Sequence, residues 1–357
     1  MDLDDEFISD SEVSSAHLLD RVEHLVLDMI QHPDSLCIRL RNRFEKKPSS
    51  KPKSITVAFP GANHSSARRF AALMRILDII SENLTFSKTV TKRDIYYRDV
   101  ALFKAQSEVD RFVDDIAATL SVPRRALGVV ASRKGVMAGF FVVKDREGKV
   151  VRVGAGSEVA LVPEIEAADE RIGLDGVDYV LVVEKEAVFQ TLVSAGFCSR
   201  PDVGRALLIT GKGYPDISTR GLVHLISETY PEIPLLGIVD SDPYGIHILG
   251  IYKYGSKAMV HEASTLIAGR LQWIGVRLLD YEYESAYAGL SKRDRRMAMN
   301  MLGNEWMDCE GAKEMRAEVQ RMLFLGRKAE MNVVGDESGL GISEYLARLI
   351  RSSLLLC

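Results

Sequence analysis

The chain has 357 residues, enough for two folded domains, and its 46% hydrophobic and 27% charged residues are typical of a soluble globular protein. It contains no apolar run of 18 or more residues and no basic-then-apolar start, so we expect neither a membrane span nor a signal peptide. The net charge of −4 gives no overall attraction for nucleic acid, and four dispersed cysteines argue against a disulfide framework or zinc site.

Residues 1–53 are predicted to form an N-terminal extension. Its tip is strongly acidic, which predicts disorder. Apolar residues then recur at helical spacing over 18–30, and we expect a helix there that packs on the body or on a partner. A basic stretch follows, and its Pro, Ser and Lys residues predict a linker over 45–53.

Residues 54–150 are predicted to form a small mixed domain with three helices. Ser66 is expected to cap the first helix, which carries an apolar stripe at helical spacing. The second is expected to begin at Thr91, with Asp94 three residues on as a partial capping box. Ser107 precedes the third helix.

Two short β-type runs follow these helices, over 127–131 and 137–143, with the SRKG turn between them. Three helices and a two-stranded ribbon are the elements of a winged helix-turn-helix. Residues 88–134 hold ten Lys or Arg against six Asp or Glu, so a basic surface that the whole-chain charge hides is expected here.

Residues 151–357 are predicted to form an α/β domain with a mostly parallel sheet. The apolar runs DYVLVVE, ALLIT and PLLGIVD alternate with helix-like segments over 186–194, 218–230 and after Pro243. Continuous apolar runs are typical of strands buried on both faces of a parallel sheet. The tail after residue 290 is charged and is expected to be helical in pieces.

Three acids occupy positions where a parallel sheet binds ligands. Glu184 ends one apolar run, Asp240 ends another, and Asp242 follows two residues later. The carboxyl ends of parallel strands meet at one edge of the sheet, so these carboxylates are expected to converge. Carboxylates held close together repel and need a cation, and oxygen ligands suit Mg²⁺. For any one of these acids alone, a solvated loop residue would be the simpler interpretation.

The segment TGKGYPD, residues 210–216, also follows a strand. It is not a P-loop, because Gly213 replaces the Ser or Thr that should follow Lys212. Its glycines allow close approach of a ligand, and Tyr214 could stack on a base or sugar. A simple turn is the alternative interpretation of this segment.

The segment KRDIYYRD, residues 92–99, places adjacent tyrosines among basic residues. A phenol is a poor nucleophile at neutral pH, but cations such as Arg93 and Arg98 make it more effective. Tyr96 and Tyr97 point about 100° apart on a helix, so only one can face a given groove. An aromatic pair with one ring in the core and one on the surface is the structural alternative.

The combination of these motifs resembles the topoisomerase VI A-subunit family, in its eukaryotic branch of meiotic DNA double-strand-break proteins. The resemblance is carried, in order, by RDIYYRDVALF, ASRKGVMAG, VLVVEKEAVFQ, ITGKGYPD and VDSDPYGIHI followed by IYKYGS, between about residues 65 and 280. It implies a winged-helix domain joined to a Toprim domain, a Rossmann-like metal-binding fold.

The resemblance also implies roles for individual residues. Tyr97 matches the nucleophile, with Tyr96 as its packed neighbour, and Arg93 matches an arginine that assists at the phosphate. Glu184, Asp240 and Asp242 match the Toprim acids that hold Mg²⁺. Lys134 and Tyr214 match positions that approach DNA, and we assign Lys212 of the same loop to DNA as well.

These roles predict cleavage of double-stranded DNA in the nucleus, with Tyr97 left in a 5′-phosphotyrosyl link. Two strands need two tyrosines, so we expect a two-fold homodimer in which each tyrosine meets the partner's metal site. Meiotic accessory proteins and a B-like subunit are expected partners. Two alternatives remain open: the A subunit of a resealing topoisomerase, and a DNA-binding scaffold whose acids are vestigial.

Overall fold

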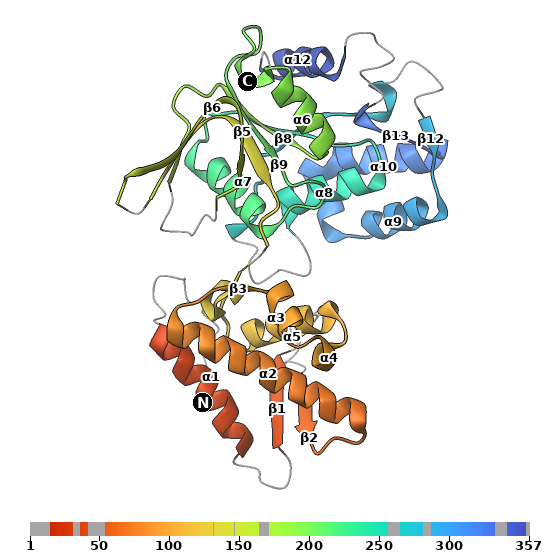
Figure 1. Cartoon of the computed structure of the whole chain (residues 1–357). Coiled ribbons are helices and arrows are strands. Elements are labelled where there is room, and N and C mark those ends of the chain that lie inside the picture. The colour runs from red at the N-terminus through yellow and green to blue at the C-terminus, as the bar shows by residue number, and fades with distance from the viewer. Residues whose placement is uncertain are drawn as a thin grey trace. The chain divides into compact units, whose positions relative to one another are not determined.

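The computed structural model describes residues 15–30, 36–41, 54–130, 132–145, 147–163, 171–255, 265–280, 287–332 and 341–354. It divides into two compact units, Met1–Ser132 and Arg133–Cys357 (Figure 1). The acidic tip and the linker over 45–53 predicted from the sequence lie outside the described residues. Among the residues that the structure does describe, no helix has the length and apolarity needed to cross a bilayer.

The first unit consists of helices and short pairs of strands. Its elements are α1 (Ser15–Ile30), β1 (Leu36–Arg41), β2 (Ser54–Phe59), α2 (His64–Phe86), β3 (Val90–Thr91), α3 (Lys92–Arg98), α4 (Val100–Phe103), α5 (Gln106–Thr119) and β4 (Val129–Val130). Strands β1 and β2 pair antiparallel, and Figure 1 shows α1 lying along α2. Leu18, Val22 and Met29 of α1 are buried in the core of this unit. The helix predicted over 18–30 is therefore confirmed, and it packs on the body.

The N-cap of helix α2 lies three residues before the predicted cap. Asn63 is the N-cap: its Oδ1 accepts from the Ser66 backbone N at 3.0 Å, while Ser66 Oγ accepts from the Asn63 N at 3.1 Å. The predicted cap at Ser66 is wrong because that residue is the third position of a reciprocal capping box. The apolar stripe is as predicted, and Leu73, Ile76 and Ile80 are fully buried.

The ribbon predicted over 127–131 and 137–143 does not form. Strand β4 pairs in parallel with β3 of the first unit. Strand β5 (Val136–Lys144) instead lies in the large sheet of the second unit, between β9 and β6. An apolar strand buries more surface with a neighbour on each side than in a two-stranded ribbon. The boundary between the units therefore falls after Ser132, and not at the predicted 150/151.

The second unit is an α/β unit around a mixed sheet of seven strands. The order is β11-β10-β8-β9-β5-β6, with β7 also paired to β5. Strands β8 (Tyr179–Val183), β9 (Ala206–Thr210) and β10 (Leu235–Ile238) are parallel, as predicted, and β11 (Gln272–Gly275), which was not predicted, extends the parallel part beside β10. Strands β5, β6 (Val150–Leu161) and β7 (Arg171–Gly173) add antiparallel pairs. The sheet is therefore parallel only in the half that carries the predicted acids.

The helices between the parallel strands match the sequence prediction closely. They are α6 (Glu186–Ser194), α7 (Ile217–Thr229) and α8 (Pro243–Tyr254). After β12 (Tyr287–Gly289), the tail contributes α9 (Lys292–Leu302), α10 (Lys313–Leu325), β13 (Arg327–Ala329) and α12 (Gly341–Leu354), so its helical character is confirmed. The five residues of β8 and the five of β9 are all buried, which explains their unbroken apolar sequences.

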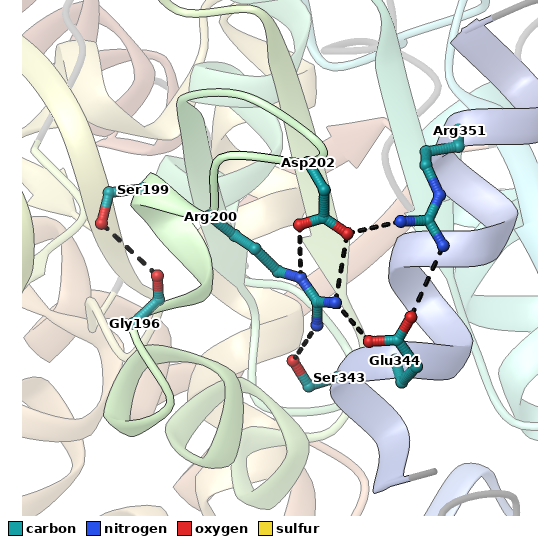
Figure 2. Close-up of polar contacts among 7 residues, drawn as sticks. All are labelled: Gly196, Ser199, Arg200, Asp202, Ser343, Glu344 and Arg351. Carbon is teal, nitrogen blue, oxygen red and sulfur yellow. Dashed lines mark hydrogen bonds and ion pairs between the residues drawn. The ribbon is translucent and has the colours of Figure 1, made fainter.

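An ionic network fixes the C-terminal helix α12 to the loop that follows α6 (Figure 2). Arg200 Nε donates to Asp202 Oδ1 at 2.6 Å, and its guanidinium also binds Ser343 Oγ at 3.1 Å and the Glu344 carboxylate. Arg351 closes the network on Asp202 and Glu344. Four charged side chains share one network. It therefore holds α12 against this loop more firmly than a single surface ion pair would.

Candidate active site

The two tyrosines of α3 face different surroundings. Tyr97 is 60% exposed, whereas Tyr96 packs against the core of the first unit. Their ring centroids are 5.4 Å apart with the planes tilted by 57°. The structure therefore leaves one phenol accessible and uses the other for packing, as predicted from their adjacent positions.

Arg93 lies one helical turn before Tyr97 and contacts it. Its Nη2 donates to the Tyr97 hydroxyl at 3.4 Å, and its guanidinium carbon lies 5.6 Å from the centre of the ring. The hydrogen bond to Tyr97 raises the pKa of Arg93, so the guanidinium remains charged. An accessible hydroxyl thus has a permanent cation beside it.

The helix that carries this pair is held firmly at its start. Thr91 and Asp94 form a complete capping box, in which Asp94 Oδ2 accepts from the Thr91 N at 2.9 Å. Ile95 is fully buried, and Lys92 forms an ion pair with the Asp114 carboxylate on α5. Lys92 is thus used structurally and Arg98 pairs with Glu82, whereas Arg93 contacts the Tyr97 hydroxyl.

The three predicted acids lie at the carboxyl ends of two neighbouring parallel strands. Glu184 follows β8, Asp240 follows β10, and Asp242 is the N-cap of α8. The backbone N of Asp240 donates to Glu184 Oε2 at 2.8 Å. A Cβ on Gly245 would lie 3.0 Å from that same oxygen and 2.4 Å from the Asp240 carbonyl oxygen. The close approach of these elements therefore requires glycine at position 245.

The electrostatics of the three acids favour a bound cation. Burial, together with repulsion from Asp240 and Asp242, raises the pKa of Glu184 to about 8. Burial also raises the pKa of Asp240 and of Asp242. Burial and mutual repulsion make these carboxylates costly to ionise. A divalent ion bound to their oxygens would stabilise the ionised forms. The chemistry of these oxygen donors thus suits a divalent cation such as Mg²⁺.

Each aspartate also has a protein partner. Asp240 Oδ2 lies 3.2 Å from Lys185 Nζ, Asp240 Oδ1 accepts from the Met331 N at 2.8 Å, and Asp242 Oδ1 accepts from the Gly245 N at 2.7 Å. Within the described part of the chain, no group of three or more His, Cys, Asp or Glu side chains is arranged to hold a metal ion. The acids are neighbours, as predicted, but their carboxylates do not converge on one point.

The glycine-rich loop is tied to the end of β8. The Gly213 N donates to the Glu184 carbonyl oxygen at 2.9 Å, and Lys212 adopts a φ of +54° beside Gly213 at +84°. Lys212 Nζ forms an ion pair with Glu186 Oε1 at 2.7 Å. The Lys212 charge is therefore held next to the strand that carries Glu184.

Of the two other residues assigned to DNA, Tyr214 belongs to this loop and Lys134 lies beside it. Tyr214 is 41% exposed and its hydroxyl is 3.0 Å from His247 Nδ1. Burial and the nearby Tyr244 raise the pKa of Tyr214 to about 12, so it stays neutral. Lys134 is exposed, and its backbone N donates to Asp216 Oδ2 at 2.7 Å, which joins its segment to the loop.

Sequence reasoning missed several residues that shape the acid site. Glu330 binds Lys185 Nζ at 2.8 Å, and the buried Glu318 accepts from Ser241 Oγ at 3.0 Å. Only Lys185 could have been found from the sequence, because it is a cation directly after the strand-end acid Glu184. Glu318 and Glu330 lie too far along the chain for spacing to indicate them.

Two family models match the chain. One, described as the Toprim domain of the topoisomerase 6 A-subunit/Spo11 family, matches residues 179–350 and includes the three acids. The other, described as type IIB DNA topoisomerase, matches residues 68–129 and includes Tyr97.

Curated relatives match over most of their length. The meiotic recombination protein SPO11 of Mus musculus is 33% identical over 302 residues, which are 84% of this chain and 74% of the mouse protein. SPO11-1 of Oryza sativa subsp. indica is 35% identical over 80% of this chain and 75% of its own. The protein rec12 of Schizosaccharomyces pombe is 32% identical over 88% of this chain and 90% of its own. The chain therefore belongs to the topoisomerase 6 A-subunit/Spo11 family.

Proposed function

We propose that this chain forms DNA double-strand breaks that initiate meiotic recombination, by topoisomerase-like transesterification in the nucleus. The observation that carries the proposal is an exposed tyrosine, Tyr97, in contact with Arg93 on a capped helix within the type IIB topoisomerase match. Family membership and the names of the meiotic relatives support the biological context.

In the proposed reaction the Tyr97 hydroxyl oxygen attacks a backbone phosphorus of DNA. A new bond joins the tyrosine oxygen to phosphorus, and the bond from phosphorus to the 3′ oxygen breaks. The phenolic proton is released, and the 3′ oxygen leaves as a hydroxyl after it takes up a proton. Arg93, which contacts the Tyr97 hydroxyl, would offset the negative charge that develops on the phosphate. One phosphoester replaces another, so cleavage needs no ATP.

Glu184, Asp240 and Asp242 would hold Mg²⁺. A bound Mg²⁺ would supply charge stabilisation at the phosphate and at the leaving oxygen. The chain itself provides a sheet edge at which Glu184 is positioned by the Asp240 backbone. The raised pKa of Glu184 means that metal binding and proton release are coupled at this side chain.

Lys134, Lys212 and Tyr214 are proposed to bind the DNA backbone or a base next to this edge. Their support is the backbone hydrogen bonding that joins the Lys134 segment and the glycine-rich loop through Asp216. The first unit is proposed to bind duplex DNA as a winged-helix domain. The support is that α2, α3 and α5 are the three helices predicted from the sequence, and that residues 88–134 carry an excess of Lys and Arg over Asp and Glu.

Cleavage of both strands is proposed to require a two-fold homodimer, because each chain carries one candidate nucleophile. Each Tyr97 would act with the acids of the partner chain. Meiotic accessory proteins and a B-like subunit are proposed as further partners.

The test is covalent capture of DNA by matched tyrosine variants. Tyr97→Phe should abolish 5′-linked protein–DNA adducts, because the ring and its packing remain while the nucleophilic oxygen is lost. Tyr96→Phe, which alters the packed neighbour in the same way, should retain adducts. Equal loss in both variants would contradict the choice of nucleophile. DNA binding that is indifferent to Mg²⁺ and yields no covalent product would support a scaffold instead.

A further inference from the structure

Lys185 places an ammonium group inside the acid site. It follows Glu184 at the start of α6, and its Nζ lies 3.2 Å from Asp240 Oδ2 and 2.8 Å from Glu330 Oε2. The side chain of Asp240 is 9% exposed, that of Lys185 27% and that of Glu330 54%. One cation is therefore shared between a buried acid and a half-exposed one.

The segment that carries Glu330 is fixed to the loop of the acids. The Ala329 N donates to the Ser241 carbonyl oxygen at 3.0 Å, and the Met331 N donates to Asp240 Oδ1 at 2.8 Å. Glu330 lies between these two bonded residues. The backbone thus holds Glu330 at a set place beside Asp240, and the Lys185 side chain can reach both.

A buried carboxylate requires a compensating charge, and Lys185 supplies it to Asp240. A divalent cation at the same oxygen would be repelled by an ammonium group in this position. Lysine has a flexible four-carbon stem, and Lys185 already binds Glu330. It can leave Asp240 by a small rotation and keep an ion pair.

We infer that Lys185 is a built-in counter-ion that competes with the divalent cation for Asp240, and that Glu330 is the acceptor that draws Lys185 away when the cation binds. The inference rests on the proposed function, since it takes Glu184, Asp240 and Asp242 as the metal ligands. Lys185 and Glu330 act through Asp240 and are therefore positioning residues.

The test measures binding of Mn²⁺, a cation with similar oxygen preference to Mg²⁺, to the full chain without DNA. Free Mn²⁺ is quantified by electron paramagnetic resonance. Lys185→Met should tighten Mn²⁺ binding by about tenfold, because the competing charge is gone. Lys185→Arg should keep the competition and bind Mn²⁺ nearly as the unaltered chain does.

Glu330→Gln should weaken Mn²⁺ binding several-fold. Of the two carboxylates that bind Lys185, only Asp240 then remains, so Lys185 competes more strongly with Mn²⁺ for it. In the Lys185→Met background the same change should have little effect, since Glu330 acts through Lys185. This background separates the proposed role from simple loss of a nearby negative charge, which would weaken Mn²⁺ binding equally in both backgrounds.

The surface pair Lys313 and Glu310, joined at 2.6 Å, provides matched controls. Lys313→Met and Glu310→Gln should leave Mn²⁺ binding unchanged. Unchanged or weaker binding by Lys185→Met, or equal effects of Glu330→Gln in the two backgrounds, would overturn the inference.

The variant Asp242→Asn distinguishes failure of the counter-ion role of Lys185 from failure of the metal assignment. If the unaltered chain binds Mn²⁺, Asp242→Asn loses it and Lys185→Met does not tighten it, only the counter-ion role is overturned. If the unaltered chain does not bind Mn²⁺, or Asp242→Asn binds it fully, the metal assignment falls and the counter-ion role falls with it.

Discussion

The two halves of the candidate chemistry are built in opposite ways. Tyr97 is 60% exposed, and its cation and its helix cap come from the same short helix. Asp240 is 6% exposed, and its partners come from two distant segments, Glu184 and Lys185 from one and Met331 from the other. A nucleophile can be prepared locally and left open to substrate. A set of buried carboxylates needs long-range assembly, because their charge must be compensated from several directions.

The largest effect is expected from Arg93→Ala, which should impair the tyrosine half and leave the acid half unchanged. If Arg93 stabilises charge at the phosphate, the rate of adduct formation should fall by about 10²–10³-fold with little change in stability. Arg98→Ala is the control, since Arg98 pairs with Glu82 at 3.2 Å and its removal should have a minor effect on the rate. Equal losses in the two variants would mean that only the general charge of α3 matters.

A packing change at Gly245 should damage the acid half alone. The added methyl of Gly245→Ala would meet the Asp240 carbonyl oxygen at 2.4 Å, and we expect a loss of about 1–3 kcal/mol in the free energy of unfolding. Mg²⁺ binding should weaken as well. Gly221→Ala in α7 is the control, because its nearest atom would be at 3.9 Å and the change should be neutral or stabilising. Calorimetry with and without Mg²⁺ measures both effects.

The acid half should also respond to pH. The pKa of Glu184 is raised from 4.5 to about 8, so the folded chain holds a proton there that the unfolded chain releases in this range. Without metal, stability should therefore fall as pH rises through this window. Mg²⁺ displaces the proton, so its affinity should rise by up to about tenfold per pH unit below the pKa. A melting-temperature increase on Mg²⁺ addition that is no larger at high pH than at low pH would contradict this.

The smallest effect is expected at the cap of the tyrosine helix. Thr91→Ala removes a side-chain acceptor from the capping box and should cost about 1 kcal/mol of unfolding free energy. Hydrogen bonds from Thr91 lower the pKa of Asp94, so this cap contributes stability above the ordinary Asp pKa and loses it as pH falls through the lowered one. Denaturant unfolding at neutral and acid pH measures the difference, which should shrink in acid.

The sequence predicted the elements whose signals are local. The run from β8 to α8 was predicted closely, because each apolar run and each helix carries its own periodicity. The capping box at Thr91 and the different orientations of Tyr96 and Tyr97 followed from spacing, whereas the assignment of the nucleophile to Tyr97 came from the family resemblance. These are the features that neighbouring residues determine.

The errors and omissions concern long-range contacts. Strand β5 was predicted to pair across the SRKG turn, but its partners are β6, β7 and β9, which come later in the chain. Met331, whose N donates to Asp240, and Glu330, which shares Lys185 with Asp240, lie far from Asp240 in sequence and have no spacing signal. A local apolar pattern predicts that a strand forms. Which strands it pairs with depends on contacts with segments far away in the sequence.

The central claim is that an exposed tyrosine and the acids of a partner chain act on one phosphate. Mixed dimers of a Tyr97→Phe chain and a Glu184→Gln chain test it most directly. If tyrosine and acids act across the dimer, one site retains both intact groups, and the mixture should nick one strand with a 5′-linked tyrosine while neither variant alone cleaves. Absence of nicking in mixtures shown to contain both chains would contradict the claim.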